Sequence, residues 1–421
     1  MRDRAPLKDV LGPGILFAAG SVGVSHLVQS TRAGAGWGLG LLGVVVLANL
    51  VKYPAFRIGP HHAATTGTSL LEGYRRQGPW AVWLYGALTL SSAFAVLAGV
   101  TVVTAGLGIA VFGLPGGPVE VSAALLAICA AILGFGKFRA LDRVLKVLVA
   151  VFTAGTLGVT VQVVGQLNWT AVQWPDLQHR PDLLFMAALF GWMPSAVDLS
   201  VWQSLWTLER SRDLRRRIPL AESMVDFHVG YWGTAVLAVC FVLMGAGLMF
   251  EQGLTFEDPA GRFAAQLVEM YGRTLGTGLE PLIGVAAFAV MFSTTLAVLD
   301  GFPRALEAFA ERVRRPEADL FEAAPSFTVR PYWLFLAFTV AGALTLLSIF
   351  PSSLKGLIDT VTTLSFLTAP ILAWLNHRAL VSPEVAAVEA PARWLRIWSA
   401  VSIGLQAVFA AVYLYLRYVL D

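Results

Sequence analysis

The chain has little of what a disulfide framework or a water-exposed surface requires. Only two of its 421 residues are cysteines, Cys129 and Cys240, and both lie inside apolar runs. A disulfide framework is therefore excluded, and we expect both to be ordinary buried side chains. Charged residues make up 14% of the chain, which is too few to cover the surface of a soluble protein of this size.

Motifs of soluble and nucleotide-driven enzymes are also missing. The sequence has no glycine-rich phosphate loop followed by Lys and Ser or Thr, no His-Glu-x-x-His helix and no paired-cysteine metal motif. We therefore expect no enzyme activity, no cofactor and no energisation by nucleotide hydrolysis. The formal net charge of +3 gives no reason to expect a nucleic-acid partner.

Hydrophobic residues, by contrast, make up 57% of the chain and occur in long runs between clusters of charge. Runs of about 20 apolar residues are long enough to cross a bilayer as helices. The pattern predicts an all-α polytopic membrane protein with eleven transmembrane helices. They are expected at residues 12–36, 38–57, 81–113, 119–135, 140–166, 182–206, 228–250, 280–302, 331–350, 354–376 and 394–419.

Basic residues gather in alternate connections between these spans. Arg215, Arg216 and Arg217 follow one span, whereas the connection 113–120 has no Lys or Arg. Cytoplasmic loops carry such an excess of Lys and Arg. We therefore expect an integral protein of the cell inner or plasma membrane, with the N-terminus cytoplasmic, no cleaved signal peptide and the C-terminus outside.

Two of the predicted spans are poor continuous helices. Residues 20–26 of the first span read Gly-Ser-Val-Gly-Val-Ser-His, and the sixth contains Gly191-Trp192-Met193-Pro194-Ser195. Pro194 removes a backbone donor, which frees carbonyls near Phe190 and Gly191. Packing alone explains either interruption, but their coincidence favours a transport site between discontinuous helices 1 and 6.

The positions of the interruptions divide the chain into repeats. Helices 1 and 6 correspond if residues 1–166 and 182–376 form two inverted five-helix repeats, with 394–421 as an extra C-terminal helix. This is the LeuT-like arrangement, in which the substrate site lies near the middle of the membrane.

Several short segments resemble the Nramp family of divalent-metal transporters over most of the chain. They are Gly12-Pro13-Gly14, Ala33-Gly34-Ala35, Leu47-Ala48-Asn49-Leu50, the turn 136–141 and Met193-Pro194. The resemblance implies the family's fold and alternating access. The chain departs from the family at its metal site, because Gly23 and His26 replace the metal-binding Asp and Asn, and Ser195 replaces a His. Residues 87–94 of the third span contain no carboxylate of a proton pathway.

The remaining polar groups at the two interruptions define the candidate site. We expect substrate binding by Gly23, Ser25, His26, Phe190, Met193, Ser195, Asp198 and Thr360. Metal ligands, if present, are His26, Met193 and Asp198, and we hypothesise that Asp198 and His26 form one proton-dependent or metal-binding unit. His26 has a second interpretation as a donor to a backbone carbonyl at the interruption. Met193 has a second interpretation as a packing residue.

Other ionisable residues in the spans receive structural interpretations. Lys52 is expected to extend to the membrane surface, and Asp226 to cap a helix or to interact with a helix dipole. Asp300 is expected to pair with Arg304. Asp359 and Thr360 lie in span 354–376, where the resemblance implies a polar residue at the site.

Three functions stay open at this point. The first is movement of a cation, with a divalent metal as one candidate. The second is transport of a small organic solute or organic cation, because Phe190 and Trp192 offer aromatic faces. We expect interfacial anchoring for the later tryptophans Trp202 and Trp206. The third is a non-transporting receptor or scaffold. The sequence predicts the lipid bilayer as a partner and does not predict an oligomeric state.

Overall fold

The computed structural model describes residues 11–135, 139–170, 172–257, 260–315, 330–349 and 354–419. This part of the chain is helical apart from loops and one isolated backbone bridge between Gly38 and Val172. The predicted all-α class is therefore confirmed. Residues 136–138 of the turn used for the family resemblance lie outside the described residues.

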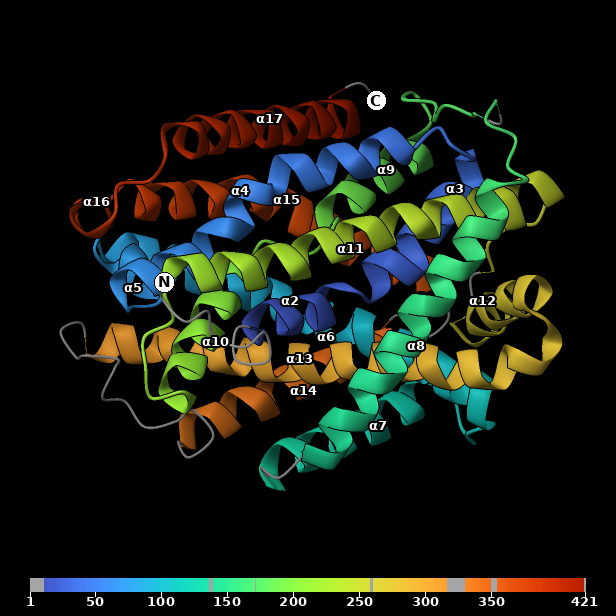
Figure 1. Ribbon diagram of the computed structural model, residues 1–421, viewed down its shortest axis with the longest axis horizontal. Helices are drawn as coiled ribbons and strands as arrows, with labels where there is room; N and C mark the ends of the chain where they lie inside the picture. The colour runs from blue at the N-terminus through green and yellow to red at the C-terminus, as the bar shows by residue number, and fades with distance from the viewer. Residues whose placement is uncertain are drawn as a thin grey trace, which may run out of the picture.

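Nine helices of the described chain are long and apolar enough to cross a membrane, and they lie side by side (Figure 1). Each overlaps one of the predicted spans. Their bounds are α4 (Leu42–Thr66), α6 (Pro79–Phe112), α7 (Pro118–Phe135), α8 (Arg139–Val164), α11 (Leu220–Leu248), α13 (Glu280–Arg314), α14 (Arg330–Ile349), α15 (Leu354–Leu380) and α17 (Arg393–Tyr418).

The two remaining predicted spans are interrupted, as the sequence indicated. The first consists of α2 (Pro13–Ser21), the π-helix η1 (Ser25–Ser30) and α3 (Thr31–Trp37). The sixth consists of α9 (Arg180–Trp192) and α10 (Leu199–Asp213). Each piece is too short to count as a membrane-spanning helix by itself. We call residues 22–24 and 193–198 the helix 1 break and the helix 6 break.

Several short helices were not predicted. The connection 251–279, expected as a loop, contains η2 (Phe250–Gln252), α12 (Ala260–Leu275) and η3 (Thr277–Leu279), while α5 (Leu70–Arg75) and α16 (Pro383–Val388) lie elsewhere. In α12, Phe263, Leu267 and Met270 recur at helical spacing and are buried, whereas Arg262 is exposed. Such an amphipathic stretch is too polar to register as a membrane span.

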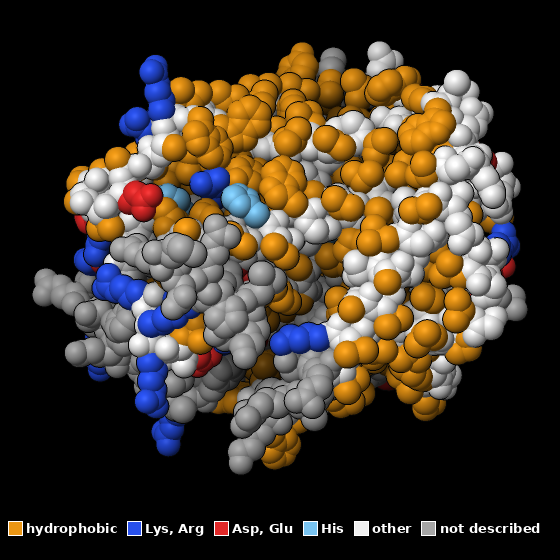
Figure 2. Space-filling view, in the orientation of Figure 1, with side chains coloured by type: hydrophobic (Ala, Val, Ile, Leu, Met, Phe, Trp, Pro, Cys, Tyr) orange, Lys and Arg blue, Asp and Glu red, His pale blue; other side chains and the backbone are white. Residues whose placement is uncertain are grey.

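Helix α6 lies at the centre of the bundle and α14 and α17 at its edge. In α6, 78% of the most apolar window is buried, compared with 28% in α14 and in α17. Figure 2 shows hydrophobic side chains over much of the viewed face of the molecule. Large apolar residues such as Val161 and Leu334 are exposed, which is the surface expected of a protein that contacts lipid.

Both halves of helix 1 pack closely against α11. A methyl group on Gly230 would lie 2.1 Å from the carbonyl oxygen of Gly14, and one on Gly34 would lie 2.1 Å from that of Val242. Glycine at these positions lets the two backbones approach closely, as is common between membrane helices. The contact holds the helix 1 break beside α13 and α6.

Candidate functional site

The helix 1 break exposes backbone carbonyls that side chains of α13 and of helix 1 partly satisfy. The Thr294 hydroxyl lies 2.7 Å from the carbonyl oxygen of Ala19 and 3.0 Å from that of Val22. It also lies 3.0 Å from the carbonyl oxygen of Val290 in its own helix, and its single proton is donated to one of the three acceptors at a time. A Cβ on Gly23 would lie 2.8 Å from Thr294 Cγ2, so glycine allows α13 to approach the break.

At the helix 6 break, α9 ends at Trp192, Met193 is extended, and α10 begins at Leu199. As predicted, the Gly191 carbonyl oxygen accepts no hydrogen bond within its own helix. It accepts one from a side chain of another helix instead. Lys52 Nζ donates to the carbonyl oxygens of Gly191 at 2.6 Å and Ser195 at 3.2 Å. The prediction that Lys52 reaches the membrane surface is wrong, because this side chain is fully buried.

Ser25 lies between the two breaks. Its Oγ is 2.8 Å from the carbonyl oxygen of Ser21, 3.1 Å from that of Pro194 and 2.7 Å from His26 Nδ1. A hydroxyl has a single proton to donate, so these three acceptors compete for it unless the ring nitrogen itself carries a proton. Ser25 thus connects the break in helix 1 to the break in helix 6.

His26 points to α11 and is fully buried. Its Nε2 lies 2.9 Å from the Thr234 carbonyl oxygen, which can only accept, so Nε2 carries a proton. In the neutral ring Nδ1 then accepts from the Ser25 hydroxyl. This arrangement matches the second interpretation of His26, a donor to a backbone carbonyl at the interruption.

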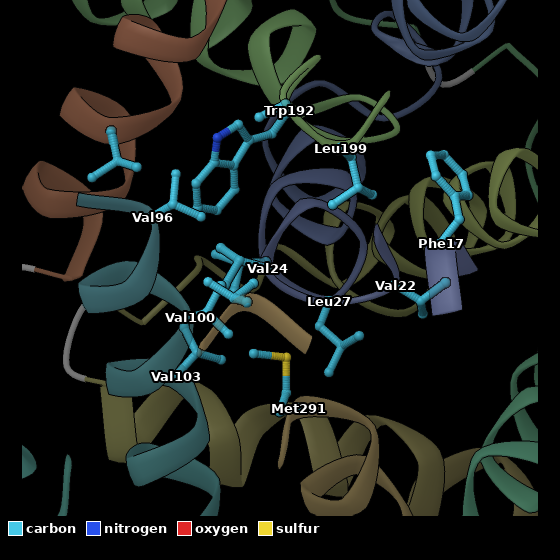
Figure 3. Packing of buried hydrophobic residues seen from close by; sticks show 14 of the residues in the cluster. Phe17, Val22, Val24, Leu27, Val96, Val100, Val103, Trp192, Leu199 and Met291 are labelled. Carbon is cyan, nitrogen blue, oxygen red and sulfur yellow. The ribbon is translucent and has the colours of Figure 1, made fainter. Parts of the chain in front are cut away.

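A small cavity of about 30 Å³ lies between the breaks, α6 and α13. By the usual requirement of about 10–15 Å³ for one water, it has room for about two water molecules or a small ion. Trp192 of α9, Val96 and Val100 of α6 and Val24 of the helix 1 break line this cavity, and Figure 3 shows these side chains near one another. Its polar lining includes Ser21, Ser25, Ser195, Asp198 and Thr294.

Asp198 is the one charged side chain among the described residues that line the cavity. It is 2% exposed and stands at the N-terminus of α10, where the helix dipole favours a negative charge. Its oxygens accept from Thr89 Oγ1 at 3.2 Å and Ser92 Oγ at 3.4 Å, both from α6. These are long contacts, and no ion pair to Asp198 is present among the described residues.

Aromatic rings form one wall of the cavity. Trp192 Nε1 donates to Ser365 Oγ at 2.8 Å, and Trp202 meets Phe302 edge-on with ring centroids 4.6 Å apart. All three rings line the cavity. The prediction that Trp202 and Trp206 anchor the protein at the membrane interface is wrong, since the two side chains are 2% and 5% exposed.

The predicted site residues fall into two groups. Gly23, Ser25, Ser195 and Asp198 line the cavity, together with Trp192. The structure does not bring the others to it. His26 bonds to Ser25 and Thr234, Phe190 packs against Phe366 and Phe409, Met193 is buried in an apolar cluster, and Thr360 is exposed and donates to Gly356.

The hypothesised unit of Asp198 and His26 is not formed. Asp198 bonds to hydroxyls of α6, whereas His26 Nδ1 bonds to Ser25 and Nε2 to the Thr234 carbonyl of α11. In the described chain, no group of three or more His, Cys, Asp or Glu side chains is placed to hold a metal ion. Of the predicted trio His26, Met193 and Asp198, only Asp198 lines the cavity.

Arg32 and Asp359 form an ion pair at the α3 end of helix 1. Arg32 Nη1 lies 2.7 Å from Asp359 Oδ1, and Nη2 lies 3.2 Å from Oδ2. The guanidinium also stacks over Phe185 at 4.5 Å. The pair joins α3 to α15, whereas the neighbouring Thr360, the residue predicted for the site, is exposed. A signal for this ion pair is present in the sequence, because an Arg lies in one predicted span and an Asp in another.

At the other end, Asp226 holds the N-terminus of α2. Its carboxylate accepts from the backbone N–H groups of Gly12 at 2.9 Å and Gly14 at 2.6 Å. The prediction that Asp226 opens its own helix as a cap or first-turn residue is wrong, because α11 begins at Leu220. The carboxylate caps α2 instead. The predicted pair of Asp300 and Arg304 is confirmed, at 3.1 Å.

Among known protein families, no family model matches the sequence. The chain is 31% identical over 387 residues to the Uncharacterized protein PM0681 of Pasteurella multocida (strain Pm70). The alignment covers 89% of this chain and 85% of that relative.

Solved structures show the fold. A manganese transporter of Eremococcus coleocola, solved in complex with an aromatic bis-isothiourea substituted compound, aligns with a TM-score of 0.74 at 15% identity, over 96% of this chain and 86% of that chain. MhsT in complex with L-phenylalanine aligns with a TM-score of 0.57 at 14% identity, over 98% and 99%. The chain is thus an integral membrane protein with the LeuT-like transporter fold, and it belongs to the same family as the Uncharacterized protein PM0681 of Pasteurella multocida.

Proposed function

We propose that this protein is a secondary transporter that moves a small, singly charged cation by alternating access. The observation that carries this proposal is the Asp198 carboxylate, which lines the cavity between the two breaks without a cationic partner among the described residues. An ionised carboxylate at membrane depth is costly unless it is paired or hydrated. A bound cation would supply that pairing.

The number and kind of ligands favour a single charge. A divalent ion is held by several carboxylates or carbonyls, or by softer nitrogen and sulfur ligands if it is a transition metal. The cavity offers one carboxylate and several hydroxyls, and His26 and Met193 do not line it. The rings of Trp192 and Trp202 would suit an ammonium group. We therefore favour a monovalent ion or an organic ammonium head over a divalent metal.

The transport mechanism follows from the two ends of the site. Arg32 and Asp359 pair at the α3 end of helix 1, while Asp226 and the glycine contacts hold α2 on α11 at the opposite end. Opening one end at a time would require breaking one set of contacts and keeping the other. We propose that residues 1–166 and 182–376 act as inverted repeats around this site and that 394–421 is an additional helix.

We also propose the orientation. If the two interrupted segments cross the membrane together with the nine continuous spans, the chain makes eleven crossings and its ends would lie on opposite sides. The basic connections favour a cytoplasmic N-terminus and an external C-terminus. Asp226 would then lie near the cytoplasmic side and the Arg32–Asp359 pair near the external side.

Uptake into proteoliposomes tests the function. We expect uptake of a labelled monovalent cation, tried as Na⁺, K⁺ and methylammonium in parallel with Mn²⁺, and a loss of at least about tenfold in Asp198→Asn, since removal of one buried charge–charge contact costs more than about 1.4 kcal/mol. The matched control is Asp213→Asn, which removes an exposed carboxylate from the same helix α10.

Each other outcome has a defined meaning. Uptake of Mn²⁺ alone would replace the singly charged substrate by a divalent metal. Saturable binding of a cation without uptake would favour the receptor or scaffold alternative. Equal uptake by wild type and Asp198→Asn would contradict the role of Asp198.

A further inference from the structure

Lys52 is the most unusual buried charge of the described chain outside the cavity. It lies midway along α4, a predicted membrane span, and none of its surface is exposed. Its Nζ has three neighbours: the carbonyl oxygen of Gly191 at 2.6 Å, that of Ser195 at 3.2 Å, and the face of the Phe190 ring, 5.7 Å from its centroid. All three belong to the helix 6 segment around the break.

None of these neighbours carries a negative charge. Within the described residues, the contacts of Lys52 are to two backbone dipoles and an aromatic ring. An ammonium group without a carboxylate partner is expensive at membrane depth, so a lysine is a poor choice for simple packing. Its presence indicates that the break itself needs a positive charge.

The surroundings of Nζ are those of a cation site. Backbone carbonyls freed from a helix are ligands for monovalent cations in membrane proteins, and the face of an aromatic ring attracts them as well. At the helix 6 break, two carbonyls and the Phe190 ring converge on one point, and that point is occupied by an atom of the chain.

We propose that the Lys52 ammonium is a built-in cation that occupies a monovalent-cation site at the helix 6 break. It neutralises the exposed carbonyl dipoles and fixes the geometry of Trp192 and Ser195, whose side chains face the cavity on the opposite side of the break. The break therefore takes no ion from solution at this position. This inference concerns a second position and stands whether or not Asp198 binds the transported solute.

Truncation of Lys52 tests the proposal by opening the site. Lys52→Ala removes the ammonium and its three adjoining methylenes, which correspond to n-propylammonium. We expect a lowered melting temperature for purified Lys52→Ala and a saturable recovery of several degrees on addition of n-propylammonium chloride, because a ligand of the folded state alone stabilises it. All proteins compared carry Asp198→Asn, so that the probe cannot act at the cavity.

Three controls separate a cation site from mere packing. Lys52→Met fills a similar volume without charge, so its melting temperature falls and n-propylammonium does not restore it. Choline chloride at equal ionic strength is too large for the site and leaves Lys52→Ala unchanged. In the Asp198→Asn parent the Lys52 side chain blocks the site, so n-propylammonium does not raise the melting temperature.

Three results would overturn the proposal: a Lys52→Met variant as stable as its parent, an equal n-propylammonium shift in Lys52→Met and Lys52→Ala, or no shift in Lys52→Ala. If Lys52→Ala does not accumulate in membranes, the comparison of Lys52→Met with its parent decides. A Lys52→Met variant that accumulates at the parent's level with the parent's melting temperature contradicts the need for a charge. Failure of this test leaves the uptake test of Asp198 unaffected.

Discussion

At the residue scale, the two breaks are held open by single side chains of neighbouring helices. The helix 1 break uses the Thr294 hydroxyl, and the helix 6 break uses the Lys52 ammonium. A carbonyl left without a donor in an apolar interior loses its hydration without compensation. Each of these side chains therefore stabilises a backbone conformation that the local sequence alone does not make favourable.

Thr294 provides a direct test of this principle. Thr294→Val keeps the shape of the side chain and removes the donor shared by the carbonyls of Ala19 and Val22. We expect a loss of about 1–3 kcal/mol in unfolding free energy, the cost of an unsatisfied buried acceptor. Thermal unfolding of the purified variant measures it. The neighbouring Ser293→Ala, whose hydroxyl bonds within its own helix to Val290, should change stability less.

Residue roles were only partly predictable from the sequence. Asp198 could be found because a carboxylate close to a proline break in an apolar run is rare. Its partners Thr89 and Ser92 could not, because hydroxyls are common in membrane helices and only the fold brings α6 beside α10. Lys52 was misinterpreted for the same reason. Its position in the predicted span suggested that the ammonium group reaches the membrane surface. The group instead donates to the carbonyl oxygen of a residue 139 positions away in the chain.

At the element scale, helix 1 is attached to α11 along its whole length. Asp226 caps α2, Thr234 accepts from His26, and glycine contacts hold both halves. Close approach of two backbones gains dispersion energy that larger residues would prevent. Movement of α2 away from α11 would have to break these contacts, so we expect the two to move together in any opening at this end.

Two glycines of α11 separate close packing from helix propensity. A methyl group on Gly230 would lie 2.1 Å from the Gly14 carbonyl oxygen, whereas one on Gly233 would have no atom within 4 Å. We expect Gly230→Ala to lower stability by about 1–3 kcal/mol through forced separation of the helices. Gly233→Ala should leave stability unchanged or raise it by up to about 1 kcal/mol, because alanine favours helix. Equal melting temperatures for the two variants would contradict the tight α2–α11 contact.

Whole helices were the most predictable part of the fold. Apolar length located each of the nine continuous spans, and the glycines and Pro194 located both interruptions. The amphipathic helix α12 and the short α5 and α16 were missed because they are too polar or too short to produce a membrane signal. The arrangement of the spans needed the fold itself, since packing between helices distant in sequence leaves little trace in one sequence.

At the scale of the whole molecule, one ionic cluster joins segments that are far apart in the chain. The Glu72 carboxylate of α5 lies 2.6 Å from Arg75, 3.0 Å from Arg76 and 3.3 Å from Arg312 at the end of α13. Arg76 also lies 3.9 Å from Glu384 of α16. The cluster closes the end of the bundle near α5 and α16 (Figure 1). Glu72, Arg75 and Arg76 lie outside the spans and Arg312 lies in the last turn of α13, so water and salt can reach the edge of the cluster.

The same cluster makes stability depend on pH. Burial raises the pKa of Glu72, but the hydrogen bond from Arg75 and the charges of Arg312, Arg75 and Arg76 outweigh it, so the pKa lies below its ordinary value. A carboxyl with a lowered folded-state pKa stabilises the fold above its unfolded value, about 4.3, and this contribution is lost as pH falls through the lower folded value.

Glu72→Gln should therefore lower unfolding free energy by about 2–4 kcal/mol at neutral pH, as for a broken buried ion pair. The difference in melting temperature between wild type and variant should be constant from pH 7 to about pH 5 and should shrink in more acidic buffer, where the wild-type carboxyl takes up a proton. The exposed Glu389→Gln serves as control and should match wild type at each pH. A difference that grows on acidification would mean that Glu72 is held in its neutral form, and the ionic cluster would then not be what joins α5 to α13.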